Sequence, residues 1–232
     1  MLETPPILTI QRNFNRPDAA NVAKLIGALT GNIADCLGGR GALDPVIKPL
    51  ADSPEGMRTV VGPAFPCQNA PSDQLGAMAA LAHAEAGDVI VAATEGYTGT
   101  AVVGDLMLGM ARNRGIVGVV TDGAVRDLGG IFKVGLPVFC AAVNPDSPSR
   151  TGPGSAGLAV DIGGATVHPG DIVVADSDGV VIVPQGLLNM VIEKLAQVRV
   201  AEAEMEAKVE DGLEMPDSWR ALFASDDVRY LD

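Results

Sequence analysis

The chain has few aromatic residues and few positive charges, and both shortages exclude classes of function. Phe, Trp and Tyr make up only 3% of its 232 residues, which leaves few side chains that could stack on nucleic-acid bases. It carries 29 Asp and Glu against 16 Lys and Arg, and this formal net charge of −13 disfavours a polyanionic partner. We therefore expect no nucleic-acid partner, although a locally positive site could still bind a small anion.

Histidine and cysteine are also scarce. The two histidines, His83 and His168, are predicted to be structural, and two are too few for His-based zinc chemistry. Cys36, Cys67 and Cys140 are far apart and lack a CxxC spacing, so we interpret them as small buried residues of a protein in a reducing compartment. No apolar run approaches the ~20 residues that span a bilayer, and no signal-peptide pattern is seen. We expect a cytoplasmic protein with no membrane partner.

Aliphatic residues, in contrast, are plentiful. Hydrophobic residues make up 47% of the chain, which is enough for a full core of Val, Ile, Leu, Ala and Met. Segments of helical and strand periodicity alternate and a meander of short strands follows, which predicts an α/β domain built in layers. We expect an N-terminal arm over residues 1–17, a domain over 18–186, and a C-terminal helix and tail over 187–232 that contribute to an oligomer.

The periodicity, the turn formers and the capping residues also predict where each element lies. The expected helices cover residues 18–37, 72–86, 104–115, 128–134 and 187–211. The expected strands cover residues 46–47, 59–61, 89–92, 116–120 and 137–141, with several short strands over 160–183.

Residues 152–157, GPGSAG, match the GxGxxG pattern of dinucleotide-binding sites. No predicted strand precedes this segment and no predicted helix follows it, so the phosphate-binding geometry has no support. We interpret residues 144–158, which are rich in Pro, Gly and Ser, as a flexible loop.

The stretch from Gly104 to Asp127 is the most informative part of the chain. A helix is predicted to begin at Gly104–Asp105, and a buried strand over residues 116–120 is predicted to end shortly before Arg126–Asp127. If this helix and strand are neighbours, Asp105 and Asp127 converge on one pocket. Two carboxylates, with waters, would suit Mg²⁺ or Mn²⁺ there. From the residues alone, structural salt links remain the alternative explanation.

Other groups in the same stretch suit an anionic substrate. The guanidinium of Arg126 could act as a fork for a substrate carboxylate or for a developing oxyanion. The N–H groups of Leu106 and Met107, in the first turn of the predicted helix, could bind another carboxylate oxygen.

The helix expected over residues 187–211 carries an apolar stripe with one acidic residue on it. The stripe repeats at heptad spacing and consists of Leu188, Val191, Leu195, Val198, Met205 and Val209. Glu202 falls on the same stripe, whereas Glu204 and Glu206 are better placed to face water. An acidic residue on an apolar stripe lies either at the frayed end of the contact or where it can reach into a site. Because the stripe has no obvious partner within the compact middle of the chain, we expect that a site reached by Glu202 belongs to another subunit.

These features together resemble a known family. The spacing Asp105-x20-Arg126-Asp127 is similar to the D-x20-R-D signature of the divalent-metal-dependent pyruvate aldolases. These are the 4-hydroxy-4-methyl-2-oxoglutarate / 4-carboxy-4-hydroxy-2-oxoadipate (HMG/CHA) aldolases, which are related to the regulator of ribonuclease E activity A (RraA). The resemblance covers about residues 20–212 and includes IADCLGG (33–39), AGDVIVAA (86–93), GDLMLGMARNRGIVGVVTDGAVRD (104–127), GLPVF (135–139) and VHPGDIVVADSDGVVIVP (167–184).

The resemblance implies a swivelling β/β/α (RraA-like) core with N- and C-terminal helical extensions, assembled as homotrimers or homohexamers with sites at subunit interfaces. It implies that Asp127 is the direct Mg²⁺ or Mn²⁺ ligand, that Asp105 holds a metal-bound water and that Arg126 binds the keto or leaving-group oxygen. Glu202, which matches by its distance to Gly212, would enter the neighbour's metal site as a catalytic residue. The groups that would bind the pyruvyl carboxylate lie at one helix start: Gly104 and the N–H groups of Leu106 and Met107.

The implied reaction cleaves a small 4-hydroxy-2-oxo acid to pyruvate and a second keto acid, with oxaloacetate decarboxylation as an expected side activity. One alternative is a regulator that binds and inhibits a ribonuclease complex, and another is a different metal-dependent lyase or decarboxylase on the same site. The C-terminal helix favours the enzyme, because the shorter regulators lack it. The acidic tail after Gly212 departs from the family pattern.

Overall fold

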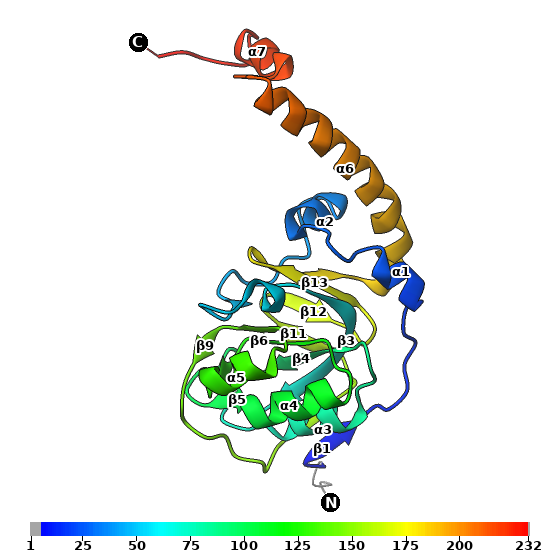
Figure 1. Cartoon of the computed structure of the whole chain (residues 1–232), viewed down its shortest axis with the longest axis vertical. Coiled ribbons are helices and arrows are strands. Elements are labelled where there is room, and N and C mark those ends of the chain that lie inside the picture. Colours follow the sequence, from blue (N-terminus) through cyan, green and yellow to red (C-terminus); the bar gives the residue numbers. More distant parts are fainter. Residues whose placement is uncertain (1–5, 232) are drawn as a thin grey trace, which may run out of the picture.

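The computed structural model describes residues 6–231, so residues 1–5 of the expected arm and the last residue of the tail lie outside it. Within the described range, no helix is both long and apolar enough to cross a membrane. The chain forms stacked layers (Figure 1): helices below a large sheet, a second group of strands above it, and then a long C-terminal helix that projects from the body. The residue pattern predicts such a layered α/β domain, and the family resemblance implies its β/β/α order.

Helices and strands alternate along the chain before the meander of short strands begins. The strands are β1 (Leu8–Ile10), β2 (Lys48–Pro49), β3 (Val60–Asn69), β4 (Val89–Ala93), β5 (Ala101–Val103), β6 (Gly118–Thr121), β7 (Ala124–Val125), β8 (Val138–Cys140), β9 (Ala142–Val143), β10 (Gly154–Ala156), β11 (Val160–Ile162), β12 (Ala165–Val167), β13 (Ile172–Asp176) and β14 (Gly179–Val183). The helices are α1 (Ala19–Ala23), α2 (Thr30–Cys36), α3 (Leu75–His83), α4 (Asp105–Asn113), α5 (Leu128–Val134), α6 (Leu188–Glu210) and α7 (Asp217–Phe223).

The largest sheet lies at the centre of the molecule. Its strands follow the order β1-β10-β3-β4-β6-β8-β2, and β13 and β14 join it through β3. The central pairs β3–β4, β4–β6 and β6–β8 are parallel. All five residues of β4 are buried, as a central strand covered on both faces requires. The near-continuous apolar runs of the sequence therefore become the strands without a solvent face.

Helices α3, α4 and α5 cover one face of this sheet (Figure 1). Phe65 of β3, Leu108 of α4 and Ile131 of α5 are fully buried in the core between them. Ile90 of β4 belongs to the same core, whereas its neighbour Val89 belongs to the core on the opposite face. Because successive side chains of a strand point to opposite faces, β4 contributes to the cores on both faces of the sheet.

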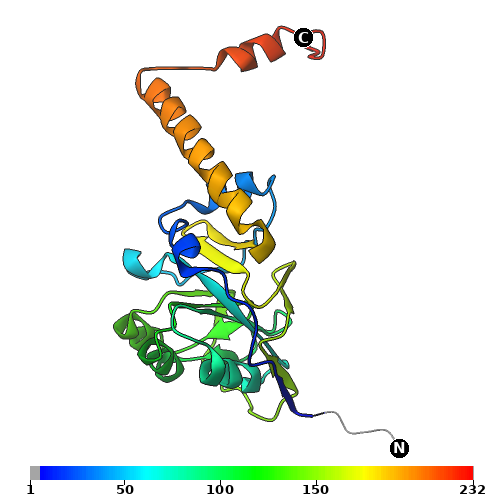
Figure 2. The same ribbon diagram turned by 90° about the vertical axis from the view of Figure 1, so that its right-hand side faces the viewer.

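The opposite face of the sheet is covered by β11 to β14, and α1, α2 and α6 pack outside β13 and β14 (Figure 2). Val173 of β13 faces inward, while the adjacent Val174 packs with Leu25 and Ile33 on the outer side. The outer core continues into α6 through Val191, which is fully buried.

The expected single helix over residues 18–37 is wrong, because the segment forms the two short helices α1 and α2. Gly27 lies between them with φ +73°, a left-handed conformation that ends helical geometry. Asp176 of β13 accepts from both the N–H and the Oγ1 of Thr30, each at 2.8 Å, and so starts α2 anew. Ile26, which a continuous amphipathic helix would bury, is 68% exposed.

The expected flexible loop over residues 144–158 is wrong in part. Residues 154–156 form β10, which lies between β1 and β3 in the central sheet. The register pairs Ser155 with Thr9 on one side and with Gln68 on the other. Because both partners are distant in sequence, the Gly- and Pro-rich composition gives no sign of this strand.

The start of α3 also differs from the prediction. The helix expected from Ser72 begins at Leu75, and Ser72 itself has φ +63°. Gln74 occupies the N-cap position, and the carboxylate of the preceding Asp73 accepts from the Leu75 N–H at 2.7 Å. Upstream, the strand expected over 59–61 extends as β3 for ten residues.

The apolar stripe of α6 does have a partner in its own chain along the first half of the helix, which corrects the sequence expectation. Leu188, Val191 and Leu195 are buried against α1, α2 and β14. Beyond them the helix leaves the body of the molecule (Figure 2), and Met205 and Val209 are exposed.

Candidate functional site

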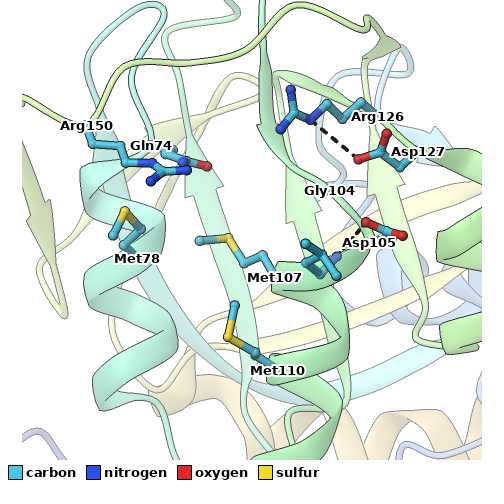
Figure 3. Close-up of a pocket in the computed structure, with 10 residues that line it drawn as sticks. Gln74, Met78, Gly104, Asp105, Met107, Met110, Arg126, Asp127 and Arg150 are labelled. Atoms are coloured by element: carbon cyan, nitrogen blue, oxygen red, sulfur yellow. Dashed lines mark hydrogen bonds and ion pairs between the residues drawn. The ribbon is translucent and has the colours of Figure 1, made fainter.

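Two short parallel strands bring the two halves of the sequence motif together. β5 pairs with β7 in a three-stranded sheet with β9. β5 leads into Gly104 and Asp105 at the start of α4, and β7 leads into Arg126 and Asp127. The sequence placed this pair after the strand over 116–120, but β6 ends at Thr121 and the separate strand β7 carries the pair. Parallel neighbours end at one edge, so these side chains lie close together (Figure 3).

Arg126 and Asp127 are partly open to solvent. Arg126 Nε lies 3.5 Å from Asp127 Oδ2, and Arg126 Nη1 donates to Ser147 Oγ at 2.5 Å. The two side chains of the ion pair are 33% and 49% exposed. An ion pair this exposed contributes little to folding stability, so a structural salt link is a weak explanation for it.

The backbone of Asp127, whose carboxylate lines the pocket described below, adopts an unusual conformation. Its φ of +67° and ψ of +44° lie in the left-handed region, which few residues other than glycine adopt. The Asp127 carbonyl accepts from the N–H groups of Gly130 at 2.9 Å and Ile131 at 3.0 Å. The first turn of α5 therefore holds this conformation, which is of the kind that concentrates at functional sites.

The start of α4 forms the next wall of the site. Its first N–H groups, those of Leu106 and Met107, have no carbonyl of the preceding turn to bind. Asp105 Oδ1 already accepts from the Leu106 N–H at 2.7 Å. Gly130 of α5 approaches Asp105 so closely that an added Cβ would lie 2.6 Å from its Cγ. The carboxylate of Asp105 is thus confined between its own helix and α5.

A pocket of about 280 Å³ opens over these residues. Its lining residues are Gln74, Met78, Gly104, Asp105, Leu106, Met107, Met110, Arg126, Asp127 and Arg150. The structure therefore brings together every site residue that the sequence predicts except Glu202. Three methionine side chains lie below the charged groups in Figure 3 and make the middle of the pocket apolar.

Sequence reasoning missed four lining residues: Gln74, Met78, Met110 and Arg150. Met110 of α4 is apolar, yet it is 51% exposed. Arg150 lies in the segment interpreted as a flexible loop. Its only signal in the sequence is a positive charge in an acidic chain, which is too weak to single it out.

Glu202 is not part of this pocket within its own chain. Its Oε2 accepts from Asn32 Nδ2 of α2 at 2.5 Å. α6 and α4 lie at opposite ends of the molecule (Figure 1). A role for Glu202 in the site of another subunit stays a prediction.

A second hollow of about 560 Å³ lies elsewhere and is lined by acidic residues that include Asp44, Glu95, Asp122 and Asp161. Asp122 is 8% exposed, and it accepts from the N–H groups of Thr94 and Gly96 at 2.7 and 2.8 Å. This carboxylate therefore ties two loops together, and its contacts give it a structural role.

The donors of the first pocket fit a hard divalent cation better than a soft one. Among residues 6–231, no group of three or more His, Cys, Asp and Glu side chains could hold a metal by themselves. Asp127 and Asp105 nevertheless present carboxylate oxygens, which Mg²⁺ and Mn²⁺ accept together with several waters. The half-exposed carboxylate of Asp127 would be the direct ligand.

Comparison with known sequences identifies similarity to one family. A family profile described as "RraA-like: Aldolase/RraA" matches residues 30–182. A protein of Halalkalibacterium halodurans named "Putative 4-hydroxy-4-methyl-2-oxoglutarate aldolase" is 35% identical over 181 residues, which cover 78% of this chain and 84% of that protein.

Solved structures show the same similarity. An uncharacterized protein from Pseudomonas syringae pv. tomato is 25% identical with a TM-score of 0.74, covering 86% of this chain and 96% of that one. Streptomyces coelicolor RraAS2, described as an unusual member of the RNase ES inhibitor RraA protein family, is 26% identical with a TM-score of 0.73. That match covers 83% of this chain and all of RraAS2 (100%).

Proposed function

The chain belongs to the aldolase/RraA family, and from this premise we propose that it is a divalent-metal-dependent aldolase. It would cleave 4-hydroxy-2-oxo acids of the HMG/CHA type to pyruvate and a second keto acid. The observation that carries the proposal is the convergence of Asp105, Arg126 and Asp127 on one pocket beside the first turn of α4. Carboxylates, a fork-shaped cation and N–H donors are the groups that a chelating 2-keto acid requires.

Each of these groups would take part in a particular step of the proposed cleavage. The N–H of Met107 would bind the substrate's 1-carboxylate at the start of α4. Asp105, directly or through a water, would accept the proton of the 4-hydroxyl. The C3–C4 bond would then break, and its electron pair would leave negative charge on the C2 oxygen, where Arg126 stabilises it. Protonation at C3 would complete pyruvate. The same charge develops when oxaloacetate loses CO₂, so decarboxylation is the expected side activity.

A divalent cation, Mg²⁺ or Mn²⁺, would be held by Asp127, and when bound it would polarise the 2-keto group as a Lewis acid. Asp127 would be the one direct carboxylate ligand, Asp105 lines the same pocket as a second carboxylate, and waters would complete the coordination. We propose no other cofactor.

The pocket rim favours a site that is completed by another subunit. Leu106 is 80% exposed and Met110 is 51% exposed, and exposed apolar side chains around a pocket are typical of interaction surfaces. We propose a cytoplasmic homotrimer or homohexamer in which Glu202 of one subunit acts at the pocket of another. A small 2-keto acid would be its ligand.

A second candidate is a regulator that inhibits a ribonuclease complex, and the similarity to RraAS2 supports it. A third is another metal-dependent lyase or decarboxylase on the same site. Turnover separates the regulator from the two enzymes, because a binding protein would release no pyruvate. Pyruvate release from oxaloacetate alone would favour the third candidate over the aldolase.

The test is a pyruvate-release assay over 4-hydroxy-2-oxo diacids and oxaloacetate, with Mg²⁺, with Mn²⁺ and with EDTA. We expect pyruvate release that EDTA abolishes and that either metal restores. Asp127→Ala should fold normally but lose turnover, because it lacks the direct metal ligand. Absence of turnover on every substrate would refute the aldolase proposal, and full Mg²⁺-dependent activity in Asp127→Ala would refute the metal assignment.

A further inference from the structure

We infer that Arg150 binds a second carboxylate of the substrate, at the end of the pocket opposite Arg126 and Asp127. The chemistry of the ligand rests on the proposed aldolase function, whereas the placement of Arg150 rests on the pocket itself. Figure 3 shows Arg150 on one side of the pocket and Arg126 with Asp127 on the other. The arrangement selects 2-oxo acids that carry a distal carboxylate.

A buried carboxylate fixes the loop that carries Arg150. Asp73, which is 3% exposed, accepts at Oδ2 from Ser149 Oγ at 2.7 Å. The same oxygen accepts from the backbone N–H groups of Thr151 at 2.7 Å and Gly152 at 3.0 Å. These hydrogen bonds flank Arg150 on both sides, so its backbone is positioned before any ligand binds.

The side chain of Arg150 is oriented as well. With the amide nitrogen of Gln74 directed toward the Val102 carbonyl at 3.2 Å, the amide oxygen accepts from Arg150 Nε at 2.8 Å. This contact uses the inner nitrogen of the guanidinium and leaves the two terminal nitrogens for a ligand. Among residues 6–231, no Asp or Glu oxygen lies within 4.0 Å of Arg150, so no internal ion pair neutralises its charge.

The space between the two charged ends suits a short carbon chain. Met78, Met107 and Met110 line it, and flexible thioether side chains adapt to apolar ligand atoms. A ligand with a carboxylate at each end would meet the α4 start and Arg126 at one end and the fork of Arg150 at the other. An uncharged tail would leave the Arg150 charge without a partner in the pocket.

Binding of two matched probes tests the inference without requiring turnover. 2-Oxoglutarate and 2-oxopentanoate share a five-carbon chain and differ only in a terminal carboxylate or methyl group. With Mg²⁺ at constant ionic strength, calorimetry should show about 10- to 100-fold tighter binding of 2-oxoglutarate to the wild-type protein. Arg150→Met should remove that preference by weakening the binding of 2-oxoglutarate while the binding of 2-oxopentanoate is unchanged. Arg150→Lys should retain part of the preference.

Arg229→Met, in the exposed tail, makes the same charge change and should leave both affinities unaltered. Equal affinity of the wild-type protein for the two probes, or an Arg150→Met variant that keeps the preference, would overturn the inference. A preference that depends on Arg150 in a protein that releases no pyruvate would uphold the inference and refute only the aldolase proposal. Pyruvate release by a protein whose preference for 2-oxoglutarate does not depend on Arg150 would support the aldolase proposal and refute the inference about Arg150.

Discussion

Arg126 is held on two sides, by Ser147 and by Asp127, so its guanidinium is oriented before a substrate arrives. We predict that Arg126→Lys loses more than about tenfold in kcat/KM, or ~1.4 kcal/mol of transition-state stabilisation, although the positive charge remains. A lysine ammonium is a point charge and cannot replace the planar fork. Steady-state pyruvate release measures the loss.

Arg112→Lys is the matched control for that variant. Arg112 lies in α4, and its Nη1 donates to the Val134 carbonyl at 2.7 Å, outside the pocket lining. This variant should keep near-normal turnover. A loss of less than tenfold in Arg126→Lys would show that the charge alone is sufficient.

Asp73 is the other residue whose chemistry can be tested directly. Burial acts to raise the pKa of Asp73, but hydrogen bonds from Ser149 and from the backbone of Leu75, Thr151 and Gly152 bring it below its ordinary 3.8. A lowered pKa in the folded state stabilises the fold above the ordinary value, and the stabilisation is lost as pH falls through the folded pKa.

We predict that Asp73→Asn lowers the free energy of unfolding at pH 7 by about 1–3 kcal/mol, since hydrogen bonds to a charged acceptor are lost. Urea unfolding of the wild-type and variant proteins at pH 7 and at pH 3 measures the difference. The gap should narrow at pH 3, because below 3.8 the unfolded wild-type chain takes up a proton that the folded carboxylate, with its lowered pKa, takes up only at lower pH. A gap that is independent of pH would show that the charge on Asp73 plays no part.

Among the helices, α5 sets the position of Asp105 through a single glycine. We predict that Gly130→Ala loses at least about tenfold in turnover while the fold survives, because the new Cβ would lie 2.6 Å from Asp105 Cγ and displace the carboxylate. Gly129→Ala is the matched control, since a Cβ there meets nothing within 4 Å. By helix propensity both changes would stabilise α5, so equal activity in the two variants would contradict the role given to Gly130.

The elements that the sequence predicts well are those whose signal is local. The apolar run of β4 and the residues that start α4 determine their own structure, and both lie where expected. α1 and α2 could not be predicted as separate helices, because Thr30 starts α2 through a hydrogen bond to Asp176, which lies far along the chain. β10 likewise depends on two distant strands.

The same distinction applies to the site. Asp105, Arg126 and Asp127 lie on one continuous stretch with a recognisable spacing, so the sequence alone predicts that they belong together. Arg150 joins them only through Asp73 and the chain segments that Asp73 connects.

Cys67 and Cys140 are buried, free thiols, and burial raises the pKa of Cys67 to about 12 and that of Cys140 to about 11. Composition was sufficient to predict their burial.

For the whole molecule, the prediction concerns Glu202, which lies on α6 beyond its last buried residue, Leu195, and accepts a hydrogen bond from Asn32 of α2. We predict that Glu202→Ala and Asp127→Ala are each inactive alone, and that subunits mixed in equal amounts after dissociation regain activity. If each site draws Asp127 from one subunit and Glu202 from another, random mixing restores about a quarter of the sites. Glu204→Ala, two residues further along α6 and exposed, is the control and should be active.

A verified mixed oligomer that stays inactive would contradict the shared site. A fully active Glu202→Ala variant would show that Glu202 has no catalytic role and serves only in its hydrogen bond with Asn32. In that case α6 would serve association alone, and the regulator hypothesis would gain support.

The hydrogen bonds that Asp73 makes with the Arg150 loop bear on how the substrate specificity of this protein could evolve. It anchors the Arg150 loop through backbone N–H groups and Ser149, so the identity of residue 150 is not needed to hold the loop in place. The groups that we propose to break the bond lie on other segments, after β5 and β7. If the proposed role of Arg150 holds, a single substitution at position 150 would alter which molecule is accepted and leave these groups unchanged. Divergence into new substrates would begin at this loop.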